Sequence, residues 1–345
     1  MYSFVNDYSE GAHSRVLEGL IRVNLEQNNG YGEDIHSHKA KEYICKAIER
    51  EDVDIHFIPG GTQTNLLVIS SFLRPHEAVI AADTGHINVH ETGAIEATGH
   101  KVIAMAVKDG KLTPKTIIEA LDNHTDEHMV KPKMVYLSNT TELGTIYTKK
   151  ELKDIHELCN EKRLYLFLDG ARIASAMTSR NNDLELKDIA SMVDVFYIGG
   201  TKNGALLGEA LIICREEFKK EFRYLIKQRG AMMAKGFVIG IQFEELFRDR
   251  LFFDLADHAN RMAEKIAKAI KECGYTFDAP TGTNQIFPIL PKEVEEQLSK
   301  EFKFMTFKKL EGNYNVLRFV TSWATTEESV EKLCNFFRGL RNSHK

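Results

Sequence analysis

Short apolar runs alternate with longer charged segments of helical periodicity along most of the chain. This alternation is typical of βαβ units around a mostly parallel sheet, because strands buried on both faces are apolar throughout and crossover helices are apolar on one face. The apolar runs predict seven strands, at residues 53–58, 78–82, 101–106, 133–137, 164–168, 193–198 and 210–214. The periodic segments predict helices at residues 64–72, 114–121, 149–161 and 186–190. We therefore expect an α/β architecture.

The pattern changes after about residue 254. It predicts one long amphipathic helix at residues 258–273 and a terminal helix that begins near Thr326. Three strands are expected between these helices, at residues 284–289, 302–308 and 316–321. This second part predicts a smaller α+β lobe. We therefore expect a large domain at residues 1–250 and a small carboxyl-terminal domain at residues 251–345, joined at about residues 247–257.

The composition is that of a well-packed globular protein, with 43% hydrophobic and 28% charged residues among 345 and only 7 prolines. The 45 basic and 50 acidic residues give a net charge of -5, so nucleic acid is not an expected partner. No apolar stretch approaches the roughly 20 residues of a membrane-spanning helix, and no basic segment precedes an apolar one at the amino terminus. Five scattered cysteines without close pairs predict reduced thiols, a cytoplasmic protein and no metal site.

Two predicted strands end in residues that can do chemistry. The strand at residues 164–168 is followed by Asp169-Gly170-Ala171-Arg172, and the strand at 193–198 is followed by Gly199-Gly200-Thr201-Lys202-Asn203-Gly204. Open α/β sheets bind ligands at the carboxyl ends of their strands, so the acid and the lysine are expected at one edge. Taken separately, the acid could simply cap a helix, and the lysine could be an ordinary surface residue.

A third segment, residues 59–65, joins a strand to a helix and contains Gly61 and Thr62. Free N–H groups and a hydroxyl at a helix start can bind an anion. An anion site, an acid and a lysine together are what pyridoxal 5′-phosphate requires, since the lysine forms a Schiff base, the acid keeps the pyridine nitrogen protonated and the helix start binds the phosphate. Neither a Walker P-loop nor the G-x-G-x-x-G motif of nicotinamide enzymes is present.

The sequence resembles the threonine aldolase and β-eliminating lyase family of fold-type I pyridoxal phosphate enzymes over nearly its whole length. It is most similar to the low-specificity and phenylserine aldolase branch. The resemblance implies the aspartate aminotransferase-like fold, with a large, mostly parallel sheet domain and a smaller α+β domain. The matching segments are Phe4-Val5-Asn6-Asp7, Tyr31-Gly32-Glu33-Asp34, Gly61-Thr62 with Asn65, His86 with Glu91 and Gly93, Asp169 to Arg172, Gly200 to Gly204, Gly208-Glu209-Ala210 and Leu317 to Trp323.

The resemblance also implies roles for individual residues. Lys202 would bind the cofactor covalently, Asp169 would contact the pyridine nitrogen and His86 would stack on the ring, and these three would be catalytic. Cofactor contacts are implied for Gly61, Thr62, His86, Asp169, Arg172, Thr201, Lys202, Lys227 and Lys235, and substrate contacts for Asn6, Tyr31, Arg172 and Arg318. Because Lys227, Lys235 and Tyr31 would serve a neighbouring subunit, a homodimer or homotetramer with shared sites is expected.

The implied reaction is retro-aldol cleavage of L-threonine, L-allo-threonine or a related β-hydroxy-α-amino acid to glycine and an aldehyde. A β-eliminating lyase or racemase with the same cofactor is the alternative enzyme, and a non-catalytic scaffold is the alternative from another class. The family often has serine where this chain has Asn6, and many threonine aldolases carry a histidine in the segment that matches residues 139–142, which has none here. The general base therefore stays open between Glu142 and a water held by His86.

Overall fold

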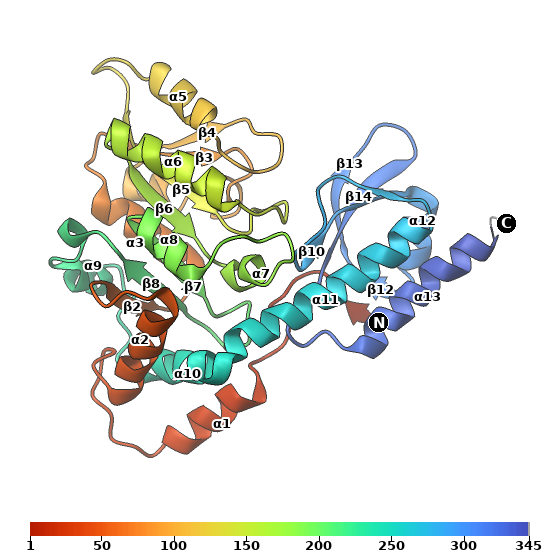
Figure 1. Cartoon of the computed structure of the whole chain (residues 1–345), viewed down its shortest axis with the longest axis horizontal. Helices are drawn as coiled ribbons and strands as arrows, with labels where there is room; N and C mark the ends of the chain where they lie inside the picture. The colour runs from red at the N-terminus through yellow and green to blue at the C-terminus, as the bar shows by residue number, and fades with distance from the viewer. Residues whose placement is uncertain (344–345) are drawn as a thin grey trace.

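A seven-stranded sheet forms the centre of the larger part of the chain, and the computed structural model describes residues 1–343 (Figure 1). Its strands lie in the order β2-β8-β7-β6-β5-β3-β4, and all run parallel except β8, which is antiparallel to both of its neighbours. The strand bounds are β2 (Asp54–Ile58), β3 (Glu77–Ala82), β4 (Val102–Met105), β5 (Lys131–Ser138), β6 (Tyr165–Asp169), β7 (Val195–Gly199) and β8 (Glu209–Ile213). All seven predicted strands are confirmed, each within two residues at either end.

Helices cover both faces of this sheet. In β6, Leu166 and Leu168 pack into one core and Phe167 packs into the other, which explains why the strand is apolar throughout. One face is covered by α2 (Ile35–Ile48), α5 (Pro114–Asp122), α6 (Lys149–Lys162), α8 (Leu186–Met192) and α10 (Phe237–Phe247). The other is covered by α3 (Gly61–Phe72), α4 (His86–Val89) and α9 (Phe222–Gln228). The four helices predicted between the strands are confirmed as α3, α5, α6 and α8.

A second, antiparallel sheet follows the long helix α11 (Leu251–Glu272), which runs from the larger part towards the carboxyl-terminal part (Figure 1). Its strands are β9 (Thr276–Phe277), β10 (Gln285–Ile286), β11 (Pro288–Pro291), β13 (Met305–Lys309) and β14 (Tyr314–Val320). Two further helices belong to this part, α12 (Lys292–Leu298) and α13 (Glu327–Ser343). The predicted smaller α+β part is confirmed, although two of its predicted strands are each interrupted by one residue, Phe287 and Phe304.

The amino terminus belongs structurally to this second part. β1 (Tyr2–Ser3) pairs in parallel with β12 (Phe302–Lys303), and Phe4 lies in the core of α11, α13 and the second sheet. The first residues therefore lead the chain directly from the second sheet to the edge of the first. The domain boundary at residue 250 stays a prediction.

Two amino-terminal helices, α1 (Ser14–Val23) and α2, pack on α10, and none of the three was predicted. All of residues 239–247 in α10 are buried, so this helix lacks the one-sided apolar pattern by which amphipathic helices are recognised. The short helix α7 (Ile173–Met177) follows β6, and three 3-10 turns lie at Glu96–Thr98, Glu216–Phe218 and Arg248–Arg250. Within residues 1–343, no helix has both the length and the apolar character needed to cross a membrane.

His36 on α2 links these helices through two carboxylates. Its Nδ1 lies 2.7 Å from Glu244 Oε2 on α10, and its Nε2 lies 2.8 Å from Glu26 Oε2. Burial lowers the pKa of His36, but the hydrogen bonds and charges of Glu26 and Glu244 outweigh burial and raise the pKa above 6.5. The protonated imidazole, which donates from both nitrogens, is therefore the form that joins α2 to α10.

His36→Gln should destabilise the protein more in mild acid than in mild alkali. Because the folded-state pKa is raised, the stabilisation by His36 is fully present below its ordinary pKa and is lost as the pH rises through the raised value. We expect a loss of about 3 kcal/mol near pH 6 and clearly less near pH 8.5, measured by denaturant unfolding. The exposed His128→Gln is the control. An equal loss at both pH values would contradict the assignment.

Candidate active site

Asp169 is the last residue of β6, and its carboxylate is buried at the carboxyl edge of the large sheet. Oδ2 accepts hydrogen bonds from the Tyr136 hydroxyl at 2.5 Å and from Asn65 Nδ2 at 3.2 Å. Oδ1 accepts from the Tyr197 hydroxyl at 2.5 Å and from the Ala171 N–H at 3.0 Å. Burial, and then the charge of Asp169, raise the pKa of both tyrosines well above 10, so both phenols stay protonated donors. Four donors thus orient the carboxylate of Asp169.

A buried hydrogen-bond network connects Asp169 with His86. Asn65 Nδ2 also donates to Glu91 Oε1 at 2.7 Å, and the same oxygen lies 2.8 Å from His86 Nδ1. The Glu91 side chain is 0% exposed, whereas that of His86 is 34% exposed. A carboxylate beside Nδ1 keeps a proton on that nitrogen and fixes the orientation of the ring. His86, which begins α4 directly after β3, is therefore held with one face accessible from the site.

Lys202 lies in the turn between β7 and β8, at the same edge as Asp169. Within residues 1–343 its amine takes part in no hydrogen bond or ion pair. Burial, and then the positive charge of Arg172, lower the pKa of Lys202, although Asp7, Asp169 and Glu209 act in the opposite direction. A lowered pKa makes the neutral, nucleophilic amine more abundant near neutral pH.

Glycines let this turn fit closely beneath the sheet edge. A Cβ on Gly200 would lie 2.8 Å from the carbonyl oxygen of Gly208 and 2.9 Å from the Phe243 ring, which is closer than a side chain can approach. Gly204 adopts φ +91°, in the left-handed region that favours glycine. These constraints explain why glycines surround the single lysine.

The N-cap residue of helix α3 is Gly60, which has no side chain to cap the helix. By contrast, the N-cap residue of α6 is Thr148, whose side chain accepts from the Glu151 N–H. The first turn of α3 therefore presents N–H groups without a side-chain acceptor, the feature by which helix starts bind anions. Thr62 is exposed in this turn, and a Cβ on Gly61 would lie 3.3 Å from the Tyr197 hydroxyl. The α3 start thus lies next to a tyrosine that contacts Asp169.

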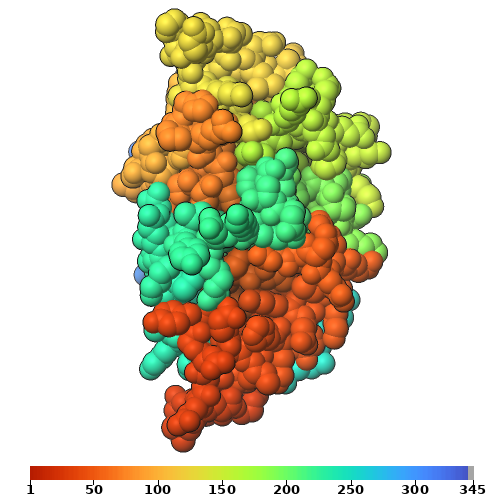
Figure 2. All heavy atoms as spheres, turned by 90° about the vertical axis from the view of Figure 1, so that its left-hand side faces the viewer, coloured from red at the N-terminus to blue at the C-terminus, as the bar shows by residue number. Residues whose placement is uncertain are grey.

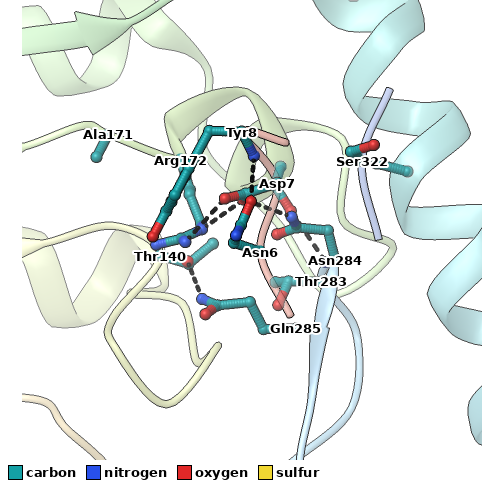
Figure 3. Close-up of polar contacts among 12 residues, drawn as sticks. Asn6, Asp7, Tyr8, Thr140, Ala171, Arg172, Thr283, Asn284, Gln285 and Ser322 are labelled. Carbon is teal, nitrogen blue, oxygen red and sulfur yellow. Dashed lines mark hydrogen bonds and ion pairs between the residues drawn. The ribbon is translucent and has the colours of Figure 1, made fainter. Parts of the chain in front are cut away.

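Arg172 forms a bidentate ion pair with the buried Asp7 (Figure 3). Nε donates to Asp7 Oδ2 at 2.7 Å, and Nη2 donates to Asp7 Oδ1 at 3.0 Å. Asn284 Nδ2 donates to the same carboxylate at 2.9 Å. Burial raises the pKa of Asp7, but the positive charges of Arg172 and Lys202, with these hydrogen bonds, lower it below its ordinary value. Within the described chain, Nη1 of Arg172 has no hydrogen-bond partner.

A second arginine, Arg318 on β14, approaches from the other sheet. Its Nε and Nη2 both donate to Gln285 Oε1, at 3.2 Å and 2.5 Å. Gln285 Nε2 in turn lies 3.4 Å from Thr140 Oγ1 (Figure 3). Burial, and then repulsion by Arg172, lower the pKa of Arg318 to about 10. As for Arg172, the part of the chain that the structure describes offers Nη1 no hydrogen-bond partner, so the two guanidinium groups together favour a bound anion.

Comparisons with known proteins agree with this arrangement. The β-eliminating lyase family matches residues 11–292, which is most of the chain. The chain belongs to this family. A low-specificity L-threonine aldolase of Pseudomonas aeruginosa is 30% identical over 97% of this chain and 96% of its own length. The chain is also similar to the structure of Leishmania major threonine aldolase, with 51% identity, a TM-score of 0.98 and coverage of 99% of this chain and 100% of that one.

The aspartate aminotransferase of Thermus thermophilus has the same fold, with a TM-score of 0.73 at 15% identity over 99% of this chain and 91% of its own. The predicted fold class and the resemblance to threonine aldolases and β-eliminating lyases are therefore confirmed. Family and fold together imply pyridoxal phosphate as the cofactor. Its fit can be tested on the residues themselves.

The site of this chain fits that cofactor. Three features of the right chemistry converge, namely a free amine on Lys202, an oriented carboxylate on Asp169 and an uncapped helix start at Gly61. The buried Asn65 Oδ1, Glu91 Oε2 and Thr84 Oγ1 have no hydrogen-bond partner within residues 1–343. Unpartnered buried polar atoms beside the sheet edge are expected where a polar ligand completes the site.

The structure brings most, but not all, of the predicted site residues together. Asn6 lies beside Asp7 and Arg172 (Figure 3), and its Oδ1 accepts from the Tyr8 N–H at 3.0 Å. The Thr201 hydroxyl donates to Glu209 Oε1 at 2.9 Å and accepts from the Gly208 N–H at 3.1 Å, so it already has two partners in the turn.

Tyr31, Lys227 and Lys235 form a separate group of neighbours. The amine of Lys227 lies 4.7 Å from the centre of the Tyr31 ring, and the Tyr31 N–H donates to the carbonyl of Ala234, next to Lys235, at 3.1 Å. Figure 2 shows the segments around residues 25–50 and 220–240 side by side. Within residues 1–343, none of the three makes a hydrogen bond, ion pair or ring contact with Asp169 or Lys202.

Sequence reasoning missed several contributors to the family's site. Tyr136 and Tyr197 lie in predicted apolar strands and Gln285 lies in another predicted strand, and the sequence predicts no site role for any of the three. The alternation of side chains along a strand could have indicated Tyr136. Tyr136 lies two residues before Ser138, so these two side chains point to the same face of the sheet, and Asp169 points there too because it pairs with Ser138. Gln285 offered no such signal, because its contact with Arg318 joins two strands of the other sheet.

Proposed function

We propose that this protein is a pyridoxal phosphate-dependent aldolase that cleaves L-threonine, L-allo-threonine or a related β-hydroxy-α-amino acid to glycine and an aldehyde. The observation that carries the proposal is the unpaired amine of Lys202, with its lowered pKa, near Asp169 and Arg172. The relatives from Pseudomonas aeruginosa and Leishmania major, both threonine aldolases by name, support cleavage over elimination or racemisation.

When bound, pyridoxal phosphate supplies an aldehyde for a lysine amine and a ring that withdraws electrons from the bond to be broken. Lys202 would bind it covalently through its unpaired amine. Asp169 would hold a proton at the ring nitrogen, because two phenols and an amide orient its carboxylate. Gly61 and Thr62 would bind the phosphate at the start of α3, and His86 would cover one face of the ring.

The substrate carboxylate would bind between Arg172 and Arg318. Asp7 occupies the Nε and Nη2 atoms of Arg172, and Gln285 occupies those of Arg318, so each guanidinium retains its Nη1 for the substrate. Fixing the carboxylate sets which bond at Cα aligns for cleavage. Arg172, which Asp7 holds in place, would therefore set this alignment.

The two candidates for the base lie together in the structure. Glu142 Oε1 accepts from the backbone N–H of His86 at 3.0 Å and from the Ser138 hydroxyl at 2.9 Å. Burial, and then the negative charge of Asp169, raise the pKa of Glu142. A carboxylate with a raised pKa is a stronger proton acceptor than a solvated one. Glu142, directly or through a water at His86, would take the proton of the β-hydroxyl.

Two or more copies would complete each site. We assign Tyr31, Lys227 and Lys235 to the site of a neighbouring copy, since they lie apart from Lys202 in their own chain. The amino-terminal segment that carries Tyr31 also exposes apolar side chains four residues apart, at 42% for Leu17 and 75% for Ile21 on α1, and at 92% for Leu25 in the turn that follows. Such an exposed apolar stripe favours a protein contact.

Lys202→Ala should abolish aldehyde and glycine release from a panel of β-hydroxy-α-amino acids that includes both threonine diastereomers. The loss should be at least about 1,000-fold, because no other amine in the site can replace that of Lys202. Lys268→Ala, which removes an exposed lysine of α11, should retain full activity. A 2-oxo acid with the carbon skeleton of the substrate and ammonia, or exchange of the Cα proton without glycine, would instead indicate elimination or racemisation.

Arg318→Gln should raise KM for the amino acid about 10- to 100-fold, because a hydrogen bond to a charged group contributes about 1.5–3 kcal/mol. The effect on kcat should be smaller, as expected for a group that binds substrate and transition state alike. Steady-state kinetics would measure the changes in KM and kcat separately, with Arg180→Gln, at an exposed position, as the control. An unchanged KM would remove Arg318 from the substrate site.

Ile21→Glu should dissociate the assembly, since it places a charge in the apolar stripe of α1. Light scattering of the native protein should give two or four times the chain mass of 39.2 kDa, and the variant should approach one chain with a loss of activity. Ile118→Glu, at a partly exposed apolar position on α5, is the control. A fully active native monomer would contradict the shared site.

A further inference from the structure

Gln285 is a fully buried amide next to one of the two site arginines. It is 0% exposed and lies in β10, opposite Val320 of the antiparallel β14. Arg318 precedes Val320 by two residues, so it is a diagonal neighbour of Gln285 on the same face of this sheet. Gln285 Oε1 accepts from Arg318 Nε at 3.2 Å and from Nη2 at 2.5 Å. Because a guanidinium only donates, the amide atom that faces it must be the oxygen.

The amide nitrogen of Gln285 therefore faces the other sheet. Nε2 lies 3.4 Å from Thr140 Oγ1 (Figure 3) and 3.5 Å from the carbonyl oxygen of Thr141, in the loop that follows β5. The same loop continues into Glu142, the candidate base. The packing here is close, since a Cβ on Gly144 would lie 3.3 Å from the Cβ of Gln285. One side chain thus connects Arg318 with the loop that carries Glu142.

The group that holds Arg318 carries no charge, unlike the group that holds Arg172. Asp7 forms an ion pair with Arg172, whereas within residues 1–343 no carboxylate forms one with Arg318. Glutamate has nearly the shape of glutamine, and at position 285 it would neutralise the guanidinium. The amide instead orients Arg318 and leaves its positive charge available to an incoming anion.

We propose that Gln285 is a positioning residue that makes the site selective for amino acids with a free α-carboxylate. It orients Arg318 through Nε and Nη2 without neutralising it, so Nη1 and the full charge stay available to the substrate. The inference rests on the proposed function, in which Arg318 binds the α-carboxylate. Amides and esters of the same amino acids should bind more weakly, because they offer Arg318 no negative charge.

Glycine and glycinamide are the probes that isolate this selectivity. They differ only in the carboxylate, and neither has a Cβ, so their binding is measured without cleavage. Gln285→Glu keeps the shape of the side chain and an acceptor for Arg318, but it adds a charge that neutralises the guanidinium. A purely structural role for Gln285 predicts that both probes lose affinity alike, whereas the proposal predicts a loss for glycine alone.

The test is calorimetric titration of the full-length, cofactor-loaded protein with each probe at neutral pH. The native protein should bind glycine more tightly than glycinamide. In Q285E the affinity for glycine should fall at least about tenfold while that for glycinamide does not fall, because a hydrogen bond between two charged groups is lost only for glycine. Gln297→Glu makes the same chemical change at an exposed position on α12 and should keep the native ratio of the two affinities.

Equal affinities of the native protein for the two probes, or an unchanged ratio in Q285E, would overturn the proposal. If Q285E does not fold, Gln285→Met decides, since it removes both hydrogen bonds to Arg318 without adding a charge. The ratio in Q285M should fall about three- to tenfold, and an unchanged ratio would overturn the proposal. Aldehyde release is assayed separately. A ratio that falls in a protein without aldolase activity would refute the proposed reaction and retain the role of Gln285.

Discussion

The buried ion pair between Asp7 and Arg172 joins three distant parts of the chain at one point. Asp7 follows β1 and Phe4, which belong to the second sheet and its core, whereas Arg172 follows β6 of the large sheet. The Asn284 amide, just before β10, completes the contact. Leaving either charge buried without its partner would cost about 3–5 kcal/mol, so this pair fixes the second sheet against the carboxyl edge of the first. The position of Arg318 relative to Lys202 depends on that arrangement.

The same edge gathers more charge than a protein interior normally holds. Asp169 is stabilised by hydrogen bonds from two phenols, an amide and a backbone N–H, and Asp7 by an arginine, but the amine of Lys202 has no partner of its own within the described residues. Its proton affinity is set at a distance, by burial and Arg172 in one direction and three carboxylates in the other. A lysine engaged in a direct ion pair would be both more strongly protonated and less free to react.

The large sheet could be predicted because its strands are buried on both faces, so every position carries the same apolar signal. The strand-end residues Asp169 and Lys202 followed from the rule that ligands bind at the carboxyl edge of open sheets. By contrast, α10 is buried all round and gives no one-sided pattern, and β1 and β9 are two-residue strands defined by their neighbours. Partners such as Gln285 depend on how the second sheet docks, which no local pattern encodes.

Arg172 and Arg318 are not equivalent, because only one of them is paired with a charged group. Asp7 neutralises Arg172, whereas Gln285 orients Arg318 with an uncharged oxygen. Repulsion by Arg172 adds to burial in lowering the pKa of Arg318, so its charge is the one left uncompensated. In the proposed site, an incoming carboxylate would therefore gain most by approaching Arg318, and Arg172 would add a rigid second contact because Asp7 already fixes it. Attraction and orientation would thus be divided between an arginine of the second sheet and one of the first.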